Sequence, residues 1–142
     1  MEFGSYLRTL CTQYGGESSI AIDAATTEIP TDVAIPLGLL AVELLTNALK
    51  HAGAGTPEQP IEIFFGETGN SKAGGNTSVL SLSVRDHGPG IAPEFLDARN
   101  RRRSASLGMR LIESLAGQIE ARIEVENTCP GVRWTLMLPF GP

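Results

Sequence analysis

The strongest structural signal in this sequence is one long amphipathic helix, predicted over Ile35 to Ala52. Its apolar residues recur every three or four positions and form one wide stripe, which comprises Leu37, Leu40, Leu44, Leu45, Ala48 and Leu49. Pro36 suits the first turn of such a helix, where a backbone N–H would have no partner. Because the stripe is wide, the helix must pack against a second layer of structure.

Five segments around this helix have the composition or alternation of β-strands. They are Ser19–Asp23, Gln59–Phe65, Ser78–Asp86, Arg122–Glu126 and Arg133–Leu138. A second amphipathic helix is predicted over Leu107–Ile119, and Tyr6–Cys11 has helical spacing. Pro130-Gly131 is typical of the turn in a hairpin, so the sheet should be mixed and mostly antiparallel. We therefore expect an α+β fold, a two-layer α/β sandwich with its helices on one face of the sheet.

Length and composition narrow the class of protein. A chain of 142 residues is typical of one domain. Its net charge of −5 argues against non-specific nucleic-acid binding, and two Cys and two His offer no zinc-binding spacing. Glu43, Thr46 and Asn47 interrupt the longest apolar stretch, which argues against a membrane span, and two reduced thiols are typical of a cytosolic protein. We therefore expect a cytoplasmic domain without membrane contact, in a full-length protein that could be soluble or membrane-anchored. Residues 1–5 resemble a cloning remnant and are left out of the predicted fold, which spans 6–142.

The first candidate site lies on the long helix. Glu43, Asn47, Lys50 and His51 have offsets of 4, 7 and 8 residues, which places them along one edge of the helix. A carboxylate and a carboxamide one turn apart offer oxygen ligands to a hard cation such as Mg²⁺. The alternative is a polar helix face in solvent.

The second candidate site follows the strand that ends near Asp86. Gly88 and Gly90 allow the backbone to approach a ligand closely, and the Asp86 carboxylate can accept a hydrogen bond from an exocyclic amine such as that of adenine. The alternative is an ordinary turn.

The third candidate site opens the second helix at Ser106-Leu107-Gly108-Met109-Arg110. Free N–H groups at a helix N-terminus bind anions, and Arg99, Arg101, Arg102 and Arg103 come just before it. These arginines could meet a polyphosphate or form a solvated charge run. The sequence contains no GxxxxGK[ST] phosphate loop.

The order and spacing of Glu43–Ala52, Asp86–Gly90 and Ser106–Leu111 resemble the ATP-binding domain of the GHKL superfamily, which has the Bergerat fold. The third segment is most similar to that of sensor histidine kinases of the HWE-related, short-lid type. The resemblance covers Tyr6 to Phe140 and implies a histidine protein kinase that uses ATP and Mg²⁺ in a two-component system. It also implies two partners, a phosphoacceptor-histidine helical domain of the same protein and a response regulator.

The resemblance assigns roles to individual residues. Glu43 and Lys50 would be catalytic, Asn47 and Glu43 would hold the metal, and residues 92–106 would form the ATP lid. The nucleotide contacts would come from Asn47, Lys50, His51, Asp86, Gly88, Gly90, Ile91, Arg103, Ser106, Leu107, Gly108, Met109 and Thr135. Thr135 is included because Val132, which follows Gly131, stands where this family commonly has a hydroxyl residue. A second departure from the family pattern is His87, which stands where Asn is common.

Two other functions fit the same motifs. One is an anti-sigma-factor serine kinase of the same superfamily, and the other is a degenerate docking or phosphotransfer module that no longer binds ATP. For the kinase interpretation, the phosphoacceptor domain is expected upstream of Tyr6, and the chain by itself is expected to bind Mg-ATP without completing autophosphorylation.

Overall fold

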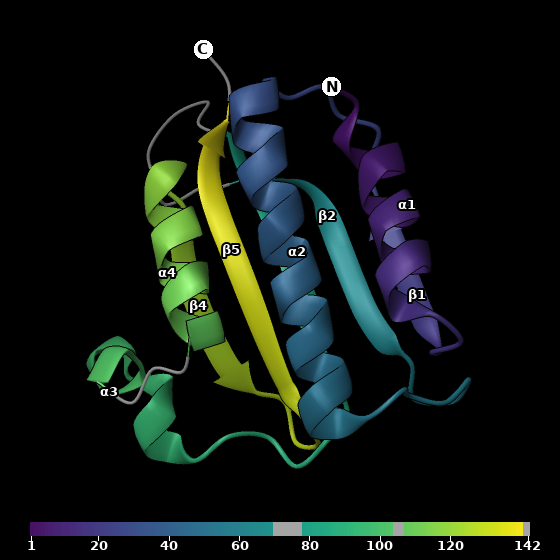
Figure 1. The fold of residues 1–142 in the computed structure, drawn as a ribbon, viewed down its shortest axis with the longest axis vertical. Helices are drawn as coiled ribbons and strands as arrows, with labels where there is room; N and C mark the ends of the chain where they lie inside the picture. The colour runs from purple at the N-terminus through teal and green to yellow at the C-terminus, as the bar shows by residue number, and fades with distance from the viewer. Residues whose placement is uncertain (70–77, 104–106, 141–142) are drawn as a thin grey trace.

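A five-stranded sheet carries three long helices on one face (Figure 1). The computed structural model describes residues 1–69, 78–103 and 107–140. The strands are β1 (Ile20–Ala24), β2 (Ile61–Gly69), β3 (Ser78–Arg85), β4 (Arg122–Asn127) and β5 (Val132–Phe140). The helices are α1 (Phe3–Gly15), α2 (Thr31–Ala52), the 3₁₀ helix η2 (Pro93–Leu96), α3 (Ala98–Arg103) and α4 (Leu107–Gln118). The predicted two-layer sandwich is confirmed.

The sheet is mixed, with strand order β1-β2-β3-β5-β4. β1 and β2 pair in parallel, and α2 connects them, as a parallel pair requires a crossover. The other three pairs are antiparallel, including the predicted β4–β5 hairpin. The mostly antiparallel prediction therefore holds.

The central helix α2 supplies much of the core. Leu37, Leu40, Leu44 and Leu45 are almost fully buried against the sheet and the neighbouring helices. By length and composition α2 could also cross a membrane, but here its apolar side packs inside the sandwich. The long apolar stripe is thus explained by the core of the fold.

The start of α2 differs from the prediction. The helix begins at Thr31 instead of Ile35, because the Pro30 carbonyl accepts hydrogen bonds from the N–H groups of Val33 and Ala34. Pro36 consequently lies inside the helix, where its missing N–H removes one intrahelical bond. The extra turn places the Ala34 side chain in the core.

Residues 1–5 belong to the fold, so their exclusion from it is wrong; their origin in cloning stays a prediction. Phe3 is fully buried and packs its ring against Tyr6 and Phe65, with centroid distances of 5.9 and 4.7 Å. The Glu2 carboxylate caps α1 by accepting hydrogen bonds from Ser5, which lowers its pKa.

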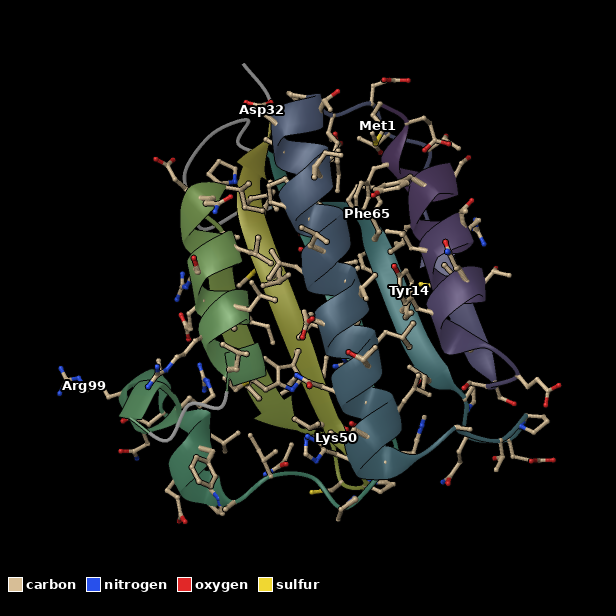
Figure 2. The ribbon with its side chains drawn as sticks, in the orientation of Figure 1. Met1, Tyr14, Asp32, Lys50, Phe65 and Arg99 are labelled. Atoms are coloured by element: carbon tan, nitrogen blue, oxygen red, sulfur yellow. The ribbon has the colours of Figure 1, made fainter. Side chains whose placement is uncertain are left out.

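Several segments that are distant in sequence meet at one end of the sandwich. The C-terminal end of α2, with Lys50, lies near η2 and α3 at this end (Figure 2). Within the expected ATP lid, residues 93–96 form η2 and residues 98–103 form α3. This end therefore combines helix ends and connecting segments over the sheet.

The two cysteines should differ strongly in reactivity. Burial raises the pKa of the Cys11 thiol to about 11, whereas Cys129 is exposed. Because only thiolates are nucleophilic, we expect an alkylating reagent at pH 8 to modify Cys129 at least about tenfold faster than Cys11 in the folded protein. Peptide mass spectrometry measures both rates, and urea should abolish the difference. Equal rates in the folded protein would contradict the burial of Cys11.

Candidate functional site

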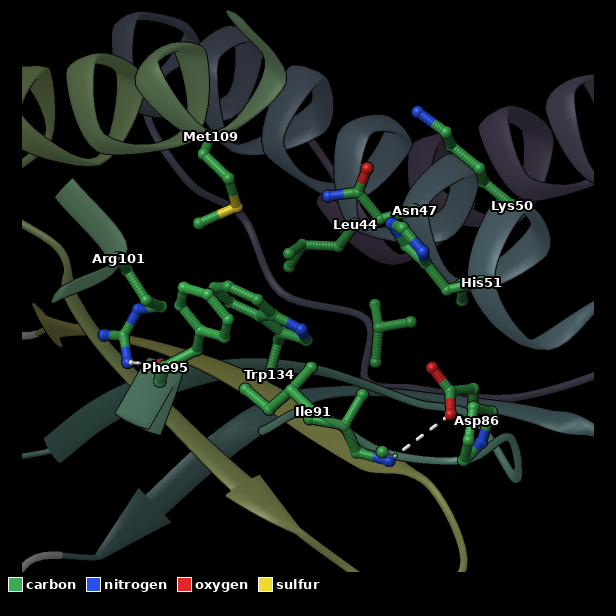
Figure 3. Close-up of a pocket in the computed structure, with 15 residues that line it drawn as sticks. Leu44, Asn47, Lys50, His51, Asp86, Ile91, Phe95, Arg101, Met109 and Trp134 are labelled. Atoms are coloured by element: carbon green, nitrogen blue, oxygen red, sulfur yellow. Dashed lines mark hydrogen bonds between the residues drawn. The ribbon is translucent and has the colours of Figure 1, made fainter. Parts of the chain in front are cut away.

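A cavity of about 400 Å³ opens at this end of the sandwich, between the helix layer and the sheet (Figure 3). Its lining comes from α2, the end of β3, the loop after it, η2, α3, α4 and β5. The lining residues are Leu44, Asn47, Ala48, Lys50, His51, Val84, Asp86, Pro89, Gly90, Ile91, Phe95, Arg101, Met109, Val132 and Trp134. A cavity of this size and mixed polarity is typical of a small-molecule site.

All three segments selected from the sequence contribute to this one cavity. The residues from the predicted set that line it are Asn47, Lys50, His51, Asp86, Gly90, Ile91 and Met109. The three segments are separated by 33 and 15 residues of chain, and the fold brings them together. Their convergence supports a single binding site and argues against three unrelated turns and helix faces.

Other predicted residues lie outside the cavity lining, namely Glu43, Gly88, Leu107, Gly108 and Thr135. Glu43 is half-buried one turn before Asn47 on α2, and Leu107 is 84% exposed at the start of α4. Ser106 and the side chain of Arg103 lie outside the described residues.

Asp86 is held firmly at one end of the cavity. The residue is 5% exposed, and its Oδ1 atom accepts hydrogen bonds from the backbone N–H groups of Gly88 (3.0 Å) and Val132 (3.3 Å). Its own N–H donates to the Val132 carbonyl at 3.0 Å. Figure 3 shows the other carboxylate oxygen directed toward the α2 side of the cavity. One oxygen thus fixes the carboxylate, and the second can meet a ligand.

Close backbone packing explains two of the glycines near Asp86. A Cβ atom at Gly88 would lie 2.5 Å from the Ala52 Cβ atom, so Gly88 lets the loop pass under the end of α2. At Gly131, which has a φ of +92°, a Cβ atom would lie 2.0 Å from the Asp86 carbonyl oxygen. The sequence pattern attributed Gly88 to ligand approach and gave Gly131 only a turn; both are packing positions that set where Asp86 lies.

The opposite end of the cavity is aromatic and cationic. Phe95 and Trp134 lie there with Arg101, whose guanidinium group is 5.6 Å from the centre of the Trp134 ring (Figure 3). Arg101 is only 6% exposed and donates from Nη1 to the carbonyls of Phe95 (2.9 Å) and Leu96 (2.8 Å). The contact combines a cation with an aromatic face and joins α3 to η2 and β5.

Sequence reasoning missed Phe95 and Trp134 as site residues and chose Arg103 from the arginine run, whereas Arg101 lines the cavity. Arg99, from the same run, points away from the protein (Figure 2). The alternation of β5 was a usable signal for Trp134, since it shares a face with the buried residues Val132 and Leu136.

The same alternation places Thr135 on the other face of the sheet, opposite Ser83 of β3. Its side chain therefore projects away from the cavity side, and we do not retain it as a contact with the base. The family's hydroxyl position, occupied here by Val132, does lie on the cavity face; Thr135, chosen as its substitute, is three residues further along β5, and an odd shift along a strand reverses the direction of the side chain.

The polar lining fits a cation only when the ligand supplies further oxygens. Within residues 1–69, 78–103 and 107–140, no three His, Cys, Asp or Glu side chains group into a metal site. Asn47 contributes one amide oxygen at the cavity, and Glu43 lies a turn away on α2. Mg²⁺ is commonly held by one or two protein ligands together with phosphate oxygens and waters, and this donor set fits that mode.

A family profile described as "Histidine kinase-like ATPase domain" matches residues 18–134. Among curated proteins, the chain is 29% identical over 129 residues to "Blue-light-activated histidine kinase 2" of Erythrobacter litoralis, covering 88% of this chain and 33% of that protein. It is 32% identical over 116 residues to "Histidine protein kinase SaeS" of Staphylococcus epidermidis, covering 72% of this chain and 30% of that protein. The chain thus spans about a third of the length of these relatives.

Solved structures show the same architecture. The Erythrobacter litoralis EL346 blue-light activated histidine kinase matches with a TM-score of 0.75 and 27% identity, over 98% of this chain and 45% of that one. The catalytic domain of histidine kinase ThkA matches with a TM-score of 0.74 over 98% of this chain and 94% of that domain. At 14% identity the ThkA likeness concerns the fold alone, and there it extends over nearly the whole domain.

Proposed function

The chain belongs to the histidine kinase-like ATPase domain family, and from this premise we propose that it binds Mg-ATP and supplies the γ-phosphoryl group for histidine phosphorylation. The observation that carries the proposal is the cavity, at which Asn47, Asp86 and Met109 meet from three distant segments. Its volume of about 400 Å³ suits the base and sugar of a nucleotide, with the phosphates toward the lid.

The adenine base fits the Asp86 end of the cavity. The free carboxylate oxygen can accept a hydrogen bond from the exocyclic amine, since Oδ1 is already bonded to two backbone N–H groups. Guanine carries an acceptor oxygen at the corresponding position and would be repelled. Ile91 and Met109, which also line the cavity, offer apolar surfaces to the flat base.

The triphosphate requires positive charge and a metal ligand. Lys50 and His51, in the last turn of α2, and Arg101 of α3 are basic side chains in the described lining of the cavity. Asn47 would hold Mg²⁺ with the phosphate oxygens, and Glu43, one turn away, is the second proposed ligand and the proposed base. The bound Mg²⁺ would neutralise charge that develops on the phosphates.

The proposed reaction transfers the γ-phosphoryl group from ATP to a histidine nitrogen, with ADP as the second product. Phosphoryl transfer depends mainly on positioning and charge neutralisation, which the cavity residues supply without covalent chemistry. Both curated relatives are named histidine kinases, and this supports a phosphoacceptor-histidine domain and a response regulator as partners.

Titration calorimetry with Mg-ATP tests the proposal directly. We expect wild-type protein to bind, and Asn47→Ala to lose most of the increase in ATP affinity that Mg²⁺ gives, because the amide oxygen is the metal ligand at the cavity. Gln13→Ala is a matched control, since Gln13 also carries a side-chain amide on a helix, is exposed on α1 and lies outside the cavity lining. An absence of ATP binding to the wild-type protein would favour the docking-module alternative.

Incubation with labelled ATP separates the kinase interpretations. The chain alone should form no phosphohistidine, because neither of its histidines belongs to a separate acceptor domain. His51 lines the cavity on the ATP-binding side, and His87 lies beside Glu62, with 3.5 Å between Nε2 and Oε2. Phosphohistidine at either residue would contradict the requirement for a separate acceptor domain. Transfer to a serine of an added antagonist protein, but not to a histidine-bearing hairpin, would favour the anti-sigma-factor kinase.

A further inference from the structure

Asn127, the last residue of β4, holds the loop that follows Asp86. Its Oδ1 atom accepts a hydrogen bond from the N–H of Ile91 at 3.0 Å, and its Nδ2 atom donates to the Ile91 carbonyl at 2.9 Å. One amide side chain thus satisfies both backbone groups of a residue 36 positions away. Because the two bonds are reciprocal, they fix the position and also the orientation of the Ile91 peptide groups.

The packing beside these bonds is equally close. Gly90 has a φ of +82°, and a Cβ atom there would lie 2.6 Å from the Asn127 Oδ1 atom and 3.3 Å from the Gly131 carbonyl oxygen. The amide therefore occupies the space that a side chain at position 90 would need. The glycine and the amide fit each other, and the loop has little room to shift without breaking the bonds.

The β4–β5 hairpin forms hydrogen bonds with both ends of the loop 86–91. At one end, the Val132 carbonyl accepts a hydrogen bond from the Asp86 N–H, and the Val132 N–H donates to the Asp86 carboxylate. At the other end, Asn127 holds Ile91. Asp86 and Ile91 both line the cavity, whereas Asn127 does not.

We infer that Asn127 is a positioning residue that sets the adenine preference of the cavity by fixing Ile91 and, through the same loop, limiting the movement of Asp86. This inference rests on the proposed nucleotide function. Discrimination against guanine requires that the Asp86 carboxylate cannot retreat from the guanine oxygen. A loop released at Ile91 can relax, so affinity for ATP falls and the repulsion of GTP is partly relieved.

The test compares Asn127→Ala with Thr128→Ala, the neighbouring residue of the same hairpin. Thr128 Oγ1 donates to the Pro130 carbonyl at 2.9 Å, so its removal also deletes a side-chain bond but none to the 86–91 loop. The dissociation constants of Mg-ATP and Mg-GTP are measured for both variants and for the wild type. We expect Asn127→Ala to weaken ATP binding about fivefold and to lower the ATP-to-GTP preference, with Thr128→Ala within about twofold of wild type for both.

The ratio of the Mg-ATP and Mg-GTP affinities distinguishes a positioning role of Asn127 from a general loss of stability. Partial unfolding would weaken both affinities by the same factor and leave their ratio unchanged. Hydrogen exchange at the Ile91 amide gives a second measure, which should accelerate in Asn127→Ala and not in Thr128→Ala. An unchanged ratio in Asn127→Ala, with wild type still binding ATP, overturns the inference and leaves the proposed function intact. If wild-type protein binds neither nucleotide, the proposed function itself fails, and faster exchange at Ile91 would then report only the backbone contact.

Discussion

Replacement of Asp86 by asparagine should weaken Mg-ATP binding by about 10- to 150-fold. The carboxylate is buried, with Oδ1 bonded to the N–H groups of Gly88 and Val132 and the other oxygen directed into the cavity. An asparagine can keep Oδ1 in place, but it then presents an NH₂ group to the adenine amine, so two donors face each other. The loss of a hydrogen bond to a buried charged group costs about 1.5–3 kcal/mol, which corresponds to that range of affinity.

Calorimetry of Asp86→Asn beside Asp23→Asn measures the effect. Asp23 is exposed on β1 at the far edge of the sheet, so its substitution removes a similar charge without touching the cavity. The control variant should bind ATP as the wild type does. An Asp86→Asn protein with undiminished affinity would remove the base-reading role from this residue.

Substitution of Gly131 by alanine should cost at least about 3 kcal/mol of unfolding free energy. The added Cβ atom would lie 2.0 Å from the Asp86 carbonyl oxygen, and that contact is with backbone and cannot be relieved by rotating a side chain. The φ of +92° adds conformational strain of about 1–3 kcal/mol for a residue with a Cβ atom. For a chain of this size the melting temperature should fall by roughly 6–12 °C.

Gly117→Ala is the matched control for this experiment. Gly117 lies inside α4, and a Cβ atom there would meet nothing within 4 Å. Because Gly117 is the next-to-last residue of α4, alanine there should gain less than the roughly 0.5–1 kcal/mol typical of a helix interior, so the melting temperature should stay the same or rise slightly while that of Gly131→Ala falls. Equal effects in thermal unfolding followed by circular dichroism would contradict the tight contact at Gly131.

Much of the fold was predictable because its segments carry local periodic signals. The alternation of residues 78–86 and the three-to-four spacing of residues 35–52 identified β3 and most of α2. Helix boundaries were less predictable: α2 extends back to Thr31 because Pro30 caps it through its backbone carbonyl, which no side-chain pattern reports. Phe3 was missed because residues 1–5 resemble a cloning remnant, and because its burial depends on Phe65, far along the chain.

Some residues of the candidate site were likewise predictable from the sequence, and others were not. Asn47 and Asp86 stand in recognisable motifs, and the cavity brings both together as the motif order predicted. Trp134 and Asn127 stand in no such motif. Trp134 lines the cavity beside Arg101, and Asn127 holds Ile91, so the role of each depends on a residue of another element.

By itself the sequence determined which segments form helices and strands and which chemical groups are available to a nucleotide, because periodicity and residue type are local properties. The tertiary structure alone decided which of those groups share a cavity and how rigidly they are held. Thr135 and Trp134 are adjacent in the chain, yet the pleat of β5 directs them to opposite faces of the sheet. The contacts that tie Asp86 and Ile91 to the β4–β5 hairpin come from residues 46 and 36 positions later, so they exist only after the sheet has formed.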